Sequence, residues 1–134
     1  MDVQKLALTV LPDRYAICRL AATDPLPAWA QVGSFVSVTR TPNELSIVCP
    51  ESQPPTGVAS QGGWRCLRVD GELDLALIGV LASIVGPLAQ ARVSVFAVST
   101  YDTDHVLIRD ELLPAAVETL RAAGHVVSAG GTTS

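Results

Sequence analysis

Residues 93–108, VSVFAVSTYDTDHVLI, consist of two apolar segments joined by a short polar turn. Alternating and β-branched apolar residues favour strands at 93–99 and 105–108. The turn between them carries Ser99, Thr100, Tyr101, Asp102 and Asp104. Hydroxyl and carboxyl groups gathered at the end of a buried strand are typical of a binding edge, so we expect function at this turn.

Helical patterns flank this pair of strands. Upstream, a strand at 64–69 (WRCLRV) precedes apolar residues at three- and four-residue spacing, which are Leu77, Leu81, Ile84, Val85 and Leu88. Downstream, a second helix starts at Asp110 and stops at Gly124, before a strand at 125–127. The order βαββαβ predicts an α+β, ferredoxin-like sandwich with an antiparallel sheet and helices on one face.

Pro87 interrupts the first helical pattern. A proline inside a helix has no amide hydrogen, so the carbonyl of Ser83 loses its usual donor. We expect the helix to bend or end near Gly86.

The first half of the chain has an apolar period of two, which predicts a unit made mostly of strands over residues 1–52. A segment rich in Pro, Gly, Ser and Gln (PESQPPTGVASQGG, 50–63) follows it, and we predict a linker at 53–62. The C-terminal unit then covers 63–128, and residues 129–134 form a frayed tail.

Composition excludes several classes of protein. The chain has 134 residues, 49% hydrophobic content and a net charge of -4, with its nine Lys and Arg residues scattered along the sequence. This distribution argues against nucleic-acid binding. No apolar run approaches the ~20 residues of a membrane span, and the first residues do not resemble a signal peptide, so we expect a cytoplasmic protein without membrane contact.

Three cysteines, Cys18, Cys49 and Cys66, each lie in an apolar, strand-like context. Such positions suit small buried thiols in a reducing compartment. The sequence has no CxxC pair, and neither His105 nor His125 has metal-ligand spacing to a cysteine. We therefore expect no disulfide, no metal site and no cofactor.

Three stretches resemble the two-ACT-domain proteins related to the CASTOR arginine sensors. They are SFVSVTRTPNELSIVCPE (34–51), GWRCLRVDGELDLALIGVLASIVGPLA (63–89) and VSVFAVSTYDTDHVLI (93–108). The resemblance implies tandem ACT-like sandwiches, with residues 1–52 as a degenerate first unit. It also implies ligand sensing without turnover, with an amino acid or similar small molecule bound between paired domains.

The resemblance also implies where the ligand binds. The matching positions are Asp74, Leu77 and Gly79 at the helix start, Val93, Ser94 and Val95 on the strand, and Thr100, Tyr101 and Asp104 in the turn. Free amides around Ile78 and Gly79 can receive a carboxylate, and Asp104 can hold an α-ammonium group. Leu77 stands where the arginine sensors carry an acid, which favours an uncharged or apolar ligand side chain.

Each position also has a purely structural interpretation. Asp104 is suited to capping the turn, and Asp74 to capping the helix. Ser94 faces solvent by alternation alone, Tyr101 suits half-buried packing, and an isolated histidine such as His105 is usually a surface residue. Within the helical pattern, Gly79 costs ~1 kcal/mol relative to Ala, which favours a close approach by a ligand or another backbone.

Two other functions compete with ligand sensing. One is a small enzyme that uses Asp104 or His105 as acid or base with Tyr101 nearby, and the other is a scaffold that only oligomerises. The sequence has no nucleophile next to a base, no phosphate-binding glycine loop and no metal spacing, so it favours binding. We expect a homodimer paired through the edge strand at 93–99.

Overall fold

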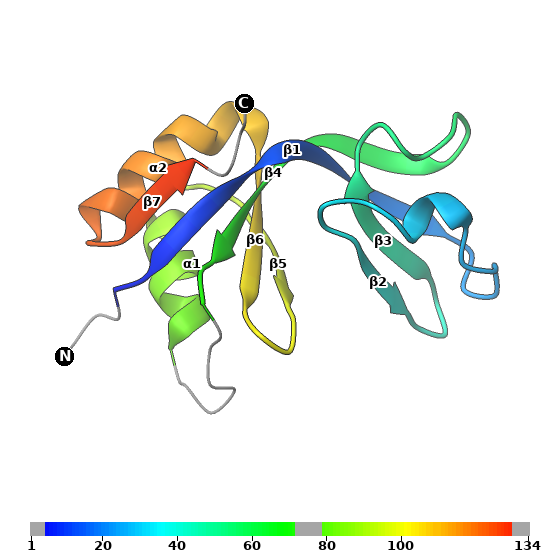
Figure 1. Ribbon diagram of the computed structural model, residues 1–134, viewed down its shortest axis with the longest axis horizontal. Coiled ribbons are helices and arrows are strands. Elements are labelled where there is room, and N and C mark those ends of the chain that lie inside the picture. The colour runs from blue at the N-terminus through cyan, green and yellow to red at the C-terminus, as the bar shows by residue number, and fades with distance from the viewer. Residues whose placement is uncertain (1–4, 72–78, 130–134) are drawn as a thin grey trace. The chain divides into compact units, whose positions relative to one another are not determined.

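The computed structural model describes residues 5–71 and 79–129, and the chain divides into two compact units. Unit 1 joins the described residues up to Pro12 with those from Arg65 onward, and unit 2 runs from Asp13 to Trp64. Strands β1 (Ala7–Leu20) and β4 (Ala59–Val69) contribute residues to both units (Figure 1).

Unit 1 contains the predicted βαββαβ order. After β4 come α1 (Val80–Gln90), β5 (Phe96–Ser99) and β6 (Asp104–Arg109). The 3-10 turn η2 (Asp110–Leu112) then leads into α2 (Leu113–Ala122) and β7 (Val126–Ala129). The strand order is β7-β1-β4-β6-β5. β5 pairs antiparallel with β6, whereas β7 pairs parallel with β1. The α+β class is confirmed, with β1 inserted between β7 and β4.

The predicted boundaries need correction at both ends. The chain's first strand was placed in a unit covering 1–52, but its first residues, Ala7 to Val10, pair with β7 in unit 1. This pairing joins segments more than a hundred residues apart, which no local pattern indicates. Ala129 lies in β7 and not in the frayed tail, and the rest of that tail lies outside the described residues.

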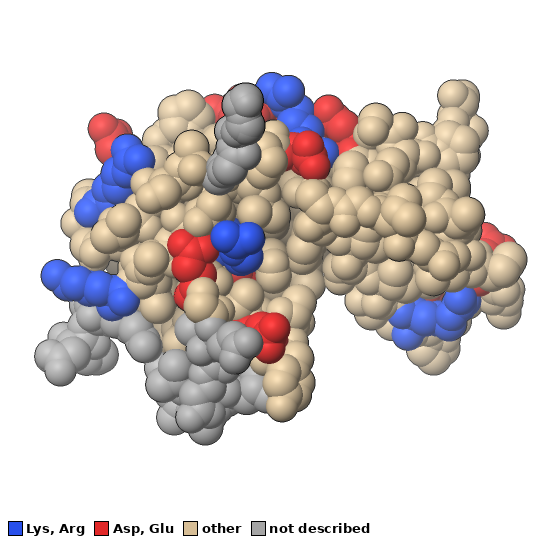
Figure 2. Space-filling view, in the orientation of Figure 1, with Lys and Arg blue, Asp and Glu red and all other residues tan. Residues whose placement is uncertain are grey.

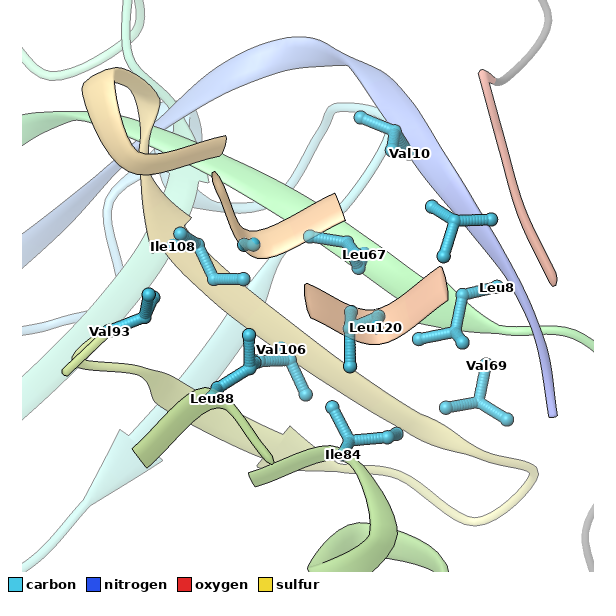
Figure 3. Packing of buried hydrophobic residues seen from close by; sticks show 12 residues of the cluster. Leu8, Val10, Leu67, Val69, Ile84, Leu88, Val93, Val106, Ile108 and Leu120 are labelled. Carbon is cyan, nitrogen blue, oxygen red and sulfur yellow. The ribbon is translucent and has the colours of Figure 1, made fainter. Parts of the chain in front are cut away.

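The core of unit 1 lies between its sheet and its two helices (Figure 3). Alternate residues of each strand face the helices. These residues are Leu8 and Val10 on β1, Leu67 and Val69 on β4, and Val106 and Ile108 on β6. The helices contribute Ile84 and Leu88 from α1 and Ala116 and Leu120 from α2. The strand period of two and the helix period of three to four therefore bury one face of each element, as the sequence predicts.

Helix α1 continues through Pro87 to Gln90, so the predicted end near Gly86 is wrong. The Ser83 carbonyl that proline deprives of a donor lies 2.9 Å from Nε2 of His125. The other ring nitrogen, Nδ1, accepts the backbone N–H of Leu6 at 3.0 Å. Nε2 therefore carries the proton and donates to Ser83. A histidine 42 residues away replaces the missing helical hydrogen bond.

Unit 2 consists of strands, loops and one short 3-10 turn, η1 (Ala28–Ala30). β3 (Leu45–Pro50) pairs antiparallel with the later part of β1 and with β2 (Ser37–Arg40). A tight turn joins β2 to β3, and in it Thr41 N–H donates to Glu44 O at 2.9 Å. The small core gathers Ala16, Cys18, Ala30, Leu45, Ile47 and Cys49.

The segment predicted as a linker, 53–62, lies within unit 2 and does not separate the two units. Nε2 of Gln53 donates to the carbonyls of Trp29 and Val32 at 2.7 and 2.9 Å. Gly63 N–H donates to Glu51 Oε1 at 2.9 Å, and β4 already begins at Ala59. Its Pro- and Gly-rich composition indicates turns, but composition does not distinguish turns packed on their own unit from a free linker.

Candidate ligand-binding site

Gly79 is the residue immediately before α1. It serves as the N-cap with φ +85°, and its carbonyl accepts the N–H of Ser83 at 2.9 Å. The predicted place of Gly79 at the helix start is confirmed, and the interpretation that puts it inside the helix is wrong. A Cβ added there would meet no atom within 4 Å, so the left-handed backbone, and not a close neighbour among the described residues, accounts for the glycine. The predicted site residues Asp74, Leu77 and Ile78 lie outside the described residues.

The β5–β6 turn is held together by its own hydroxyl groups. Thr100 N–H and Oγ1 both donate to Thr103 O, at 2.8 and 2.9 Å, and Thr100 Oγ1 accepts Thr103 N–H at 3.3 Å. Asp104 Oδ1 accepts a hydrogen bond from Ser99 Oγ at 2.7 Å. Ser99, Thr100, Thr103 and Asp104 are thus brought together. The carboxylate of Asp104 is half-buried and has further acceptor positions beyond the one that Ser99 uses.

Tyr101 lies at the tip of this turn with 82% of its surface exposed. The half-buried packing considered for it from the sequence is therefore wrong. A ring at this position is available to an approaching molecule.

The three strand positions predicted for the site differ in where they face. Val93 is buried in the core of unit 1, and its N–H donates to Leu88 O at 2.8 Å. Val95 is partly buried against the same core. Ser94 between them is exposed. These residues precede β5, which is shorter than predicted and forms one end of the strand order.

Thr103 connects the turn to the end of β4. Its hydroxyl donates to the carbonyl of Val69, the last residue of β4, at 2.7 Å, and the side chain is buried. The chain leads from Val69 toward Gly79 at the start of α1. The β5–β6 turn and the first turn of α1 therefore lie at the same end of unit 1 (Figure 1). Thr103, whose hydroxyl lies between two acidic residues in YDTD, was not predicted as a functional residue from the sequence.

A second feature missed from the sequence is the polar group around Asp70, which follows β4. Both carboxylate oxygens accept a hydrogen bond from Thr9 Oγ1, at 2.8 and 2.9 Å, and Oδ1 also accepts from Nε and Nη2 of Arg68 at 3.3 and 3.2 Å. Asp70 N–H donates to Ala7 O at 2.9 Å. These bonds hold the backbone at the end of β4.

His105 is buried, with 8% of its surface exposed, so the expected surface position is wrong. It belongs to β6, where both faces of the strand are covered over Val106 to Ile108. Burial lowers the pKa of His105, the charge of Arg68 lowers it further, and Asp104 opposes both effects.

Buried cysteines, scattered charges and a surface groove are found elsewhere among the described residues. All three cysteines are buried and free, as their strand contexts predict. Within residues 5–71 and 79–129, no three His, Cys, Asp or Glu side chains are placed to hold a metal ion. The face in Figure 2 carries scattered Lys and Arg side chains rather than one basic patch. A groove on the outer surface of α2 is lined by Leu113, Pro114, Val117, Glu118 and Arg121, away from the predicted site residues.

Neither described α-helix is long and apolar enough to cross a membrane.

Comparison with known proteins connects this geometry to a family. A family model described as an ACT domain matches residues 59–122, and another, described as an N-terminal domain, matches residues 13–56. The human cytosolic arginine sensor for mTORC1 subunit 1 is 36% identical over 97 residues, which cover 64% of this chain and 30% of that protein. The chain therefore spans less than a third of the length of this relative.

Solved structures extend the match over both units. A protein from Agrobacterium tumefaciens is 37% identical with a TM-score of 0.92, and the match covers 98% of each chain. The ligand-free regulatory subunit of aspartate kinase from Thermus thermophilus is 13% identical with a TM-score of 0.58, covering 83% of this chain and 93% of that one, which shows the fold alone. Taken with the βαββαβ order of β4 to β7, the family match shows that residues 59–122 of this chain belong to the ACT-domain family.

Proposed function

We propose that this protein is a non-catalytic regulator that binds an amino acid at the end of unit 1 where α1 begins. The ACT-domain match at residues 59–122 carries this proposal. The similarity to a protein named as an arginine sensor supports it. The name of the first relative also refers to the cytosol, and we propose the same compartment for this chain.

The proposed ligand contacts combine two kinds of group. The first turn of α1, after Gly79, offers unpaired backbone amides to a carboxylate, and the resemblance adds Asp74, Leu77 and Ile78 to this side. The half-buried carboxylate of Asp104 offers a charge-assisted hydrogen bond to an ammonium group. An α-amino acid carries both of these charges, which is why we favour this class of ligand.

Hydroxyl and apolar groups complete the proposed site. Ser94 is exposed beside the strand, and Tyr101 is exposed at the turn. We propose that Val93 and Val95 act by fixing the strand, because both pack against the core. Thr100 holds the turn that presents Asp104.

We further propose that two chains pair through β5. This strand forms one end of the strand order, and such an edge has unpaired backbone groups that a second copy can use. A C2 dimer would place two equivalent sites at the shared edge. Ala97 is exposed on β5, so Ala97→Lys should prevent pairing while leaving the fold intact. Sedimentation at micromolar concentration measures the oligomeric state of both proteins. A wild-type protein that stays monomeric with and without ligand would contradict pairing through β5.

The binding proposal is tested by a thermal-shift screen over the common amino acids. A ligand at a hundred times its Kd adds about 2.7 kcal/mol to the free energy of unfolding, which raises the melting temperature measurably. Asp104→Asn is the informative variant, because an amide oxygen still accepts the bond from Ser99 while the charge for an ammonium group is gone. We expect this variant to melt like the wild type alone and to lose the ligand shift.

Asp102→Asn is the matched control, because Asp102 lies in the same turn and is exposed. We expect it to keep the full shift. Equal shifts in both variants would mean that Asp104 serves the turn alone, and no shift with any amino acid would contradict the proposed ligand class.

A further inference from the structure

Cys18 on β1 and Cys49 on β3 are neighbours in the core of unit 2. In the antiparallel register Cys18 faces Ile47, and Cys49 faces Ala16, so the two cysteines lie on one diagonal of the strand pair. Both side chains point into the same buried cluster. Their thiols share a hydrogen bond. Two thiols that share one buried cluster across neighbouring strands are placed for a reaction with each other.

We propose that Cys18 and Cys49 form a reversible disulfide that crosslinks β1 to β3 when the protein meets a two-electron thiol oxidant. With a hydroperoxide, one thiol is first oxidised to a sulfenic acid and the peroxide leaves as water or alcohol. The sulfur of the second thiol then attacks the first sulfur. The S–S bond forms, the S–O bond breaks, and the hydroxyl group of the sulfenic acid leaves as water with the proton of the second thiol.

The diagonal register is what makes this bond reversible. Diagonal partners on antiparallel strands have Cα atoms ~7–8 Å apart, which is at or beyond the ~7 Å limit for bridging two cysteines without moving the backbone. Closing the bond therefore requires β1 and β3 to shift slightly along each other. A bond that holds two strands in a shifted register is more easily reduced than a relaxed structural disulfide.

Burial makes the reaction slow. Desolvation raises the pKa of Cys18 and raises that of Cys49 to about 12, so little thiolate is present near neutral pH. An oxidant reaches the pair only when β1 and β3 open locally. We therefore expect the disulfide to form during sustained oxidation and not during a brief exposure to oxidant.

The experiment uses the full chain with Cys66→Ala, which leaves only this pair. Cys66 belongs to unit 1, so its removal does not touch the strand pair. The reduced protein is incubated overnight without denaturant with diamide, whose N=N bond takes up the two electrons and two protons, and is then unfolded and alkylated. We expect a monomer that has lost two hydrogen atoms, resists alkylation, and yields a linked peptide pair containing Cys18 and Cys49.

Cys49→Ala in the same background is the matched control, and it should give an alkylated single thiol or a diamide adduct. Dithiothreitol should restore two alkylatable thiols in the crosslinked protein. Two thiols that remain alkylatable after overnight treatment would overturn the proposal, as would crosslinks only between different chains. If Cys66→Ala does not fold, peptide mapping of the wild type reads the same linkage, and a bond involving Cys66 would also overturn it.

Discussion

Units 1 and 2 are stabilised in different ways. Unit 1 buries large aliphatic side chains between a sheet and two helices, including Leu8, Leu88 and Leu120. Unit 2 has no α-helix to cover its strands, and its core includes small residues such as Ala16 and Cys18. Its loops are instead fixed by side chains that bind backbone carbonyls, as Gln53 does. A helix layer supplies stability through burial, and a unit without one depends more on individual hydrogen bonds.

Two large-to-small substitutions test this difference most directly. Leu120→Ala should lower the free energy of unfolding by about 3–5 kcal/mol, because a cavity between α2 and the sheet has little room to collapse. Ile47→Ala in unit 2 should cost less, about 2–3 kcal/mol, because loops can relax around it. Urea unfolding measures both, with Leu26→Ala as the exposed control. A larger loss for Ile47→Ala would contradict the comparison.

Unit 1 also contains side chains that bind backbone groups, and His125 is the one that replaces a missing helical hydrogen bond. His125→Ala should cost about 2–4 kcal/mol, because it leaves Leu6 N–H and Ser83 O without partners inside the fold. Pro87→Ala restores the amide that Ser83 lacks in the helix. In that background the cost of His125→Ala should fall by about 1 kcal/mol, which a double-mutant cycle measures. Strict additivity would mean that His125 does not substitute for the missing amide.

In unit 2, Gln53→Ala should cost about 1–2 kcal/mol, because two carbonyls lose their donor. Hydrogen exchange should show faster exchange of the amides around Trp29 and Val32 and no change in unit 1. The matched control is Gln31→Ala. The Gln31 side chain is exposed, and its bonds to the carbonyls of Leu26 and Pro27 are longer, at 3.4 and 3.3 Å. Equal effects of the two substitutions would contradict this account of how the loop is held.

The same division separates what the sequence predicts from what it does not. The elements of unit 1 follow from periodicity, because each one buries a single regular face. The insertion of β1 beside β7 and the bond from His125 to Ser83 join distant parts of the chain, and no local pattern encodes them. The polar turn that contains Thr100 and Asp104 was predicted from its residue types, and the role of these two residues in binding stays a prediction. The left-handed cap at Gly79 was not predicted, because glycine fits both a helix and a left-handed cap.

Alanine substitutions at two glycines of unit 1 distinguish the effect of backbone conformation on stability from the effect of packing. Gly79→Ala should cost about 1 kcal/mol, because its φ of +85° disfavours a Cβ although no atom would clash. Gly86 lies inside α1, and a Cβ added there would also meet open space. Gly86→Ala should therefore raise the free energy of unfolding by about 0.5–1 kcal/mol. Thermal unfolding should show a lower melting temperature for Gly79→Ala and a higher one for Gly86→Ala than for the wild type. Shifts of the same sign would contradict the assigned start of α1.

The smallest expected effect is the dependence of stability on pH through His105. Its pKa in the folded protein lies below the ordinary value of about 6.5, since burial and Arg68 both disfavour the charged ring. The unfolded chain therefore binds the proton more readily than the folded one. The contribution of His105 to the free energy of unfolding is fully present above about pH 6.5 and is lost as the pH falls toward the pKa of the folded protein. Below that pKa the contribution changes no further. Urea midpoints at pH 7.5 and 5 should differ less in His105→Gln than in the wild type. An equal difference would mean that the ring is as free to charge in β6 as it is in the unfolded chain, and that the covered strand imposes no cost on the cation.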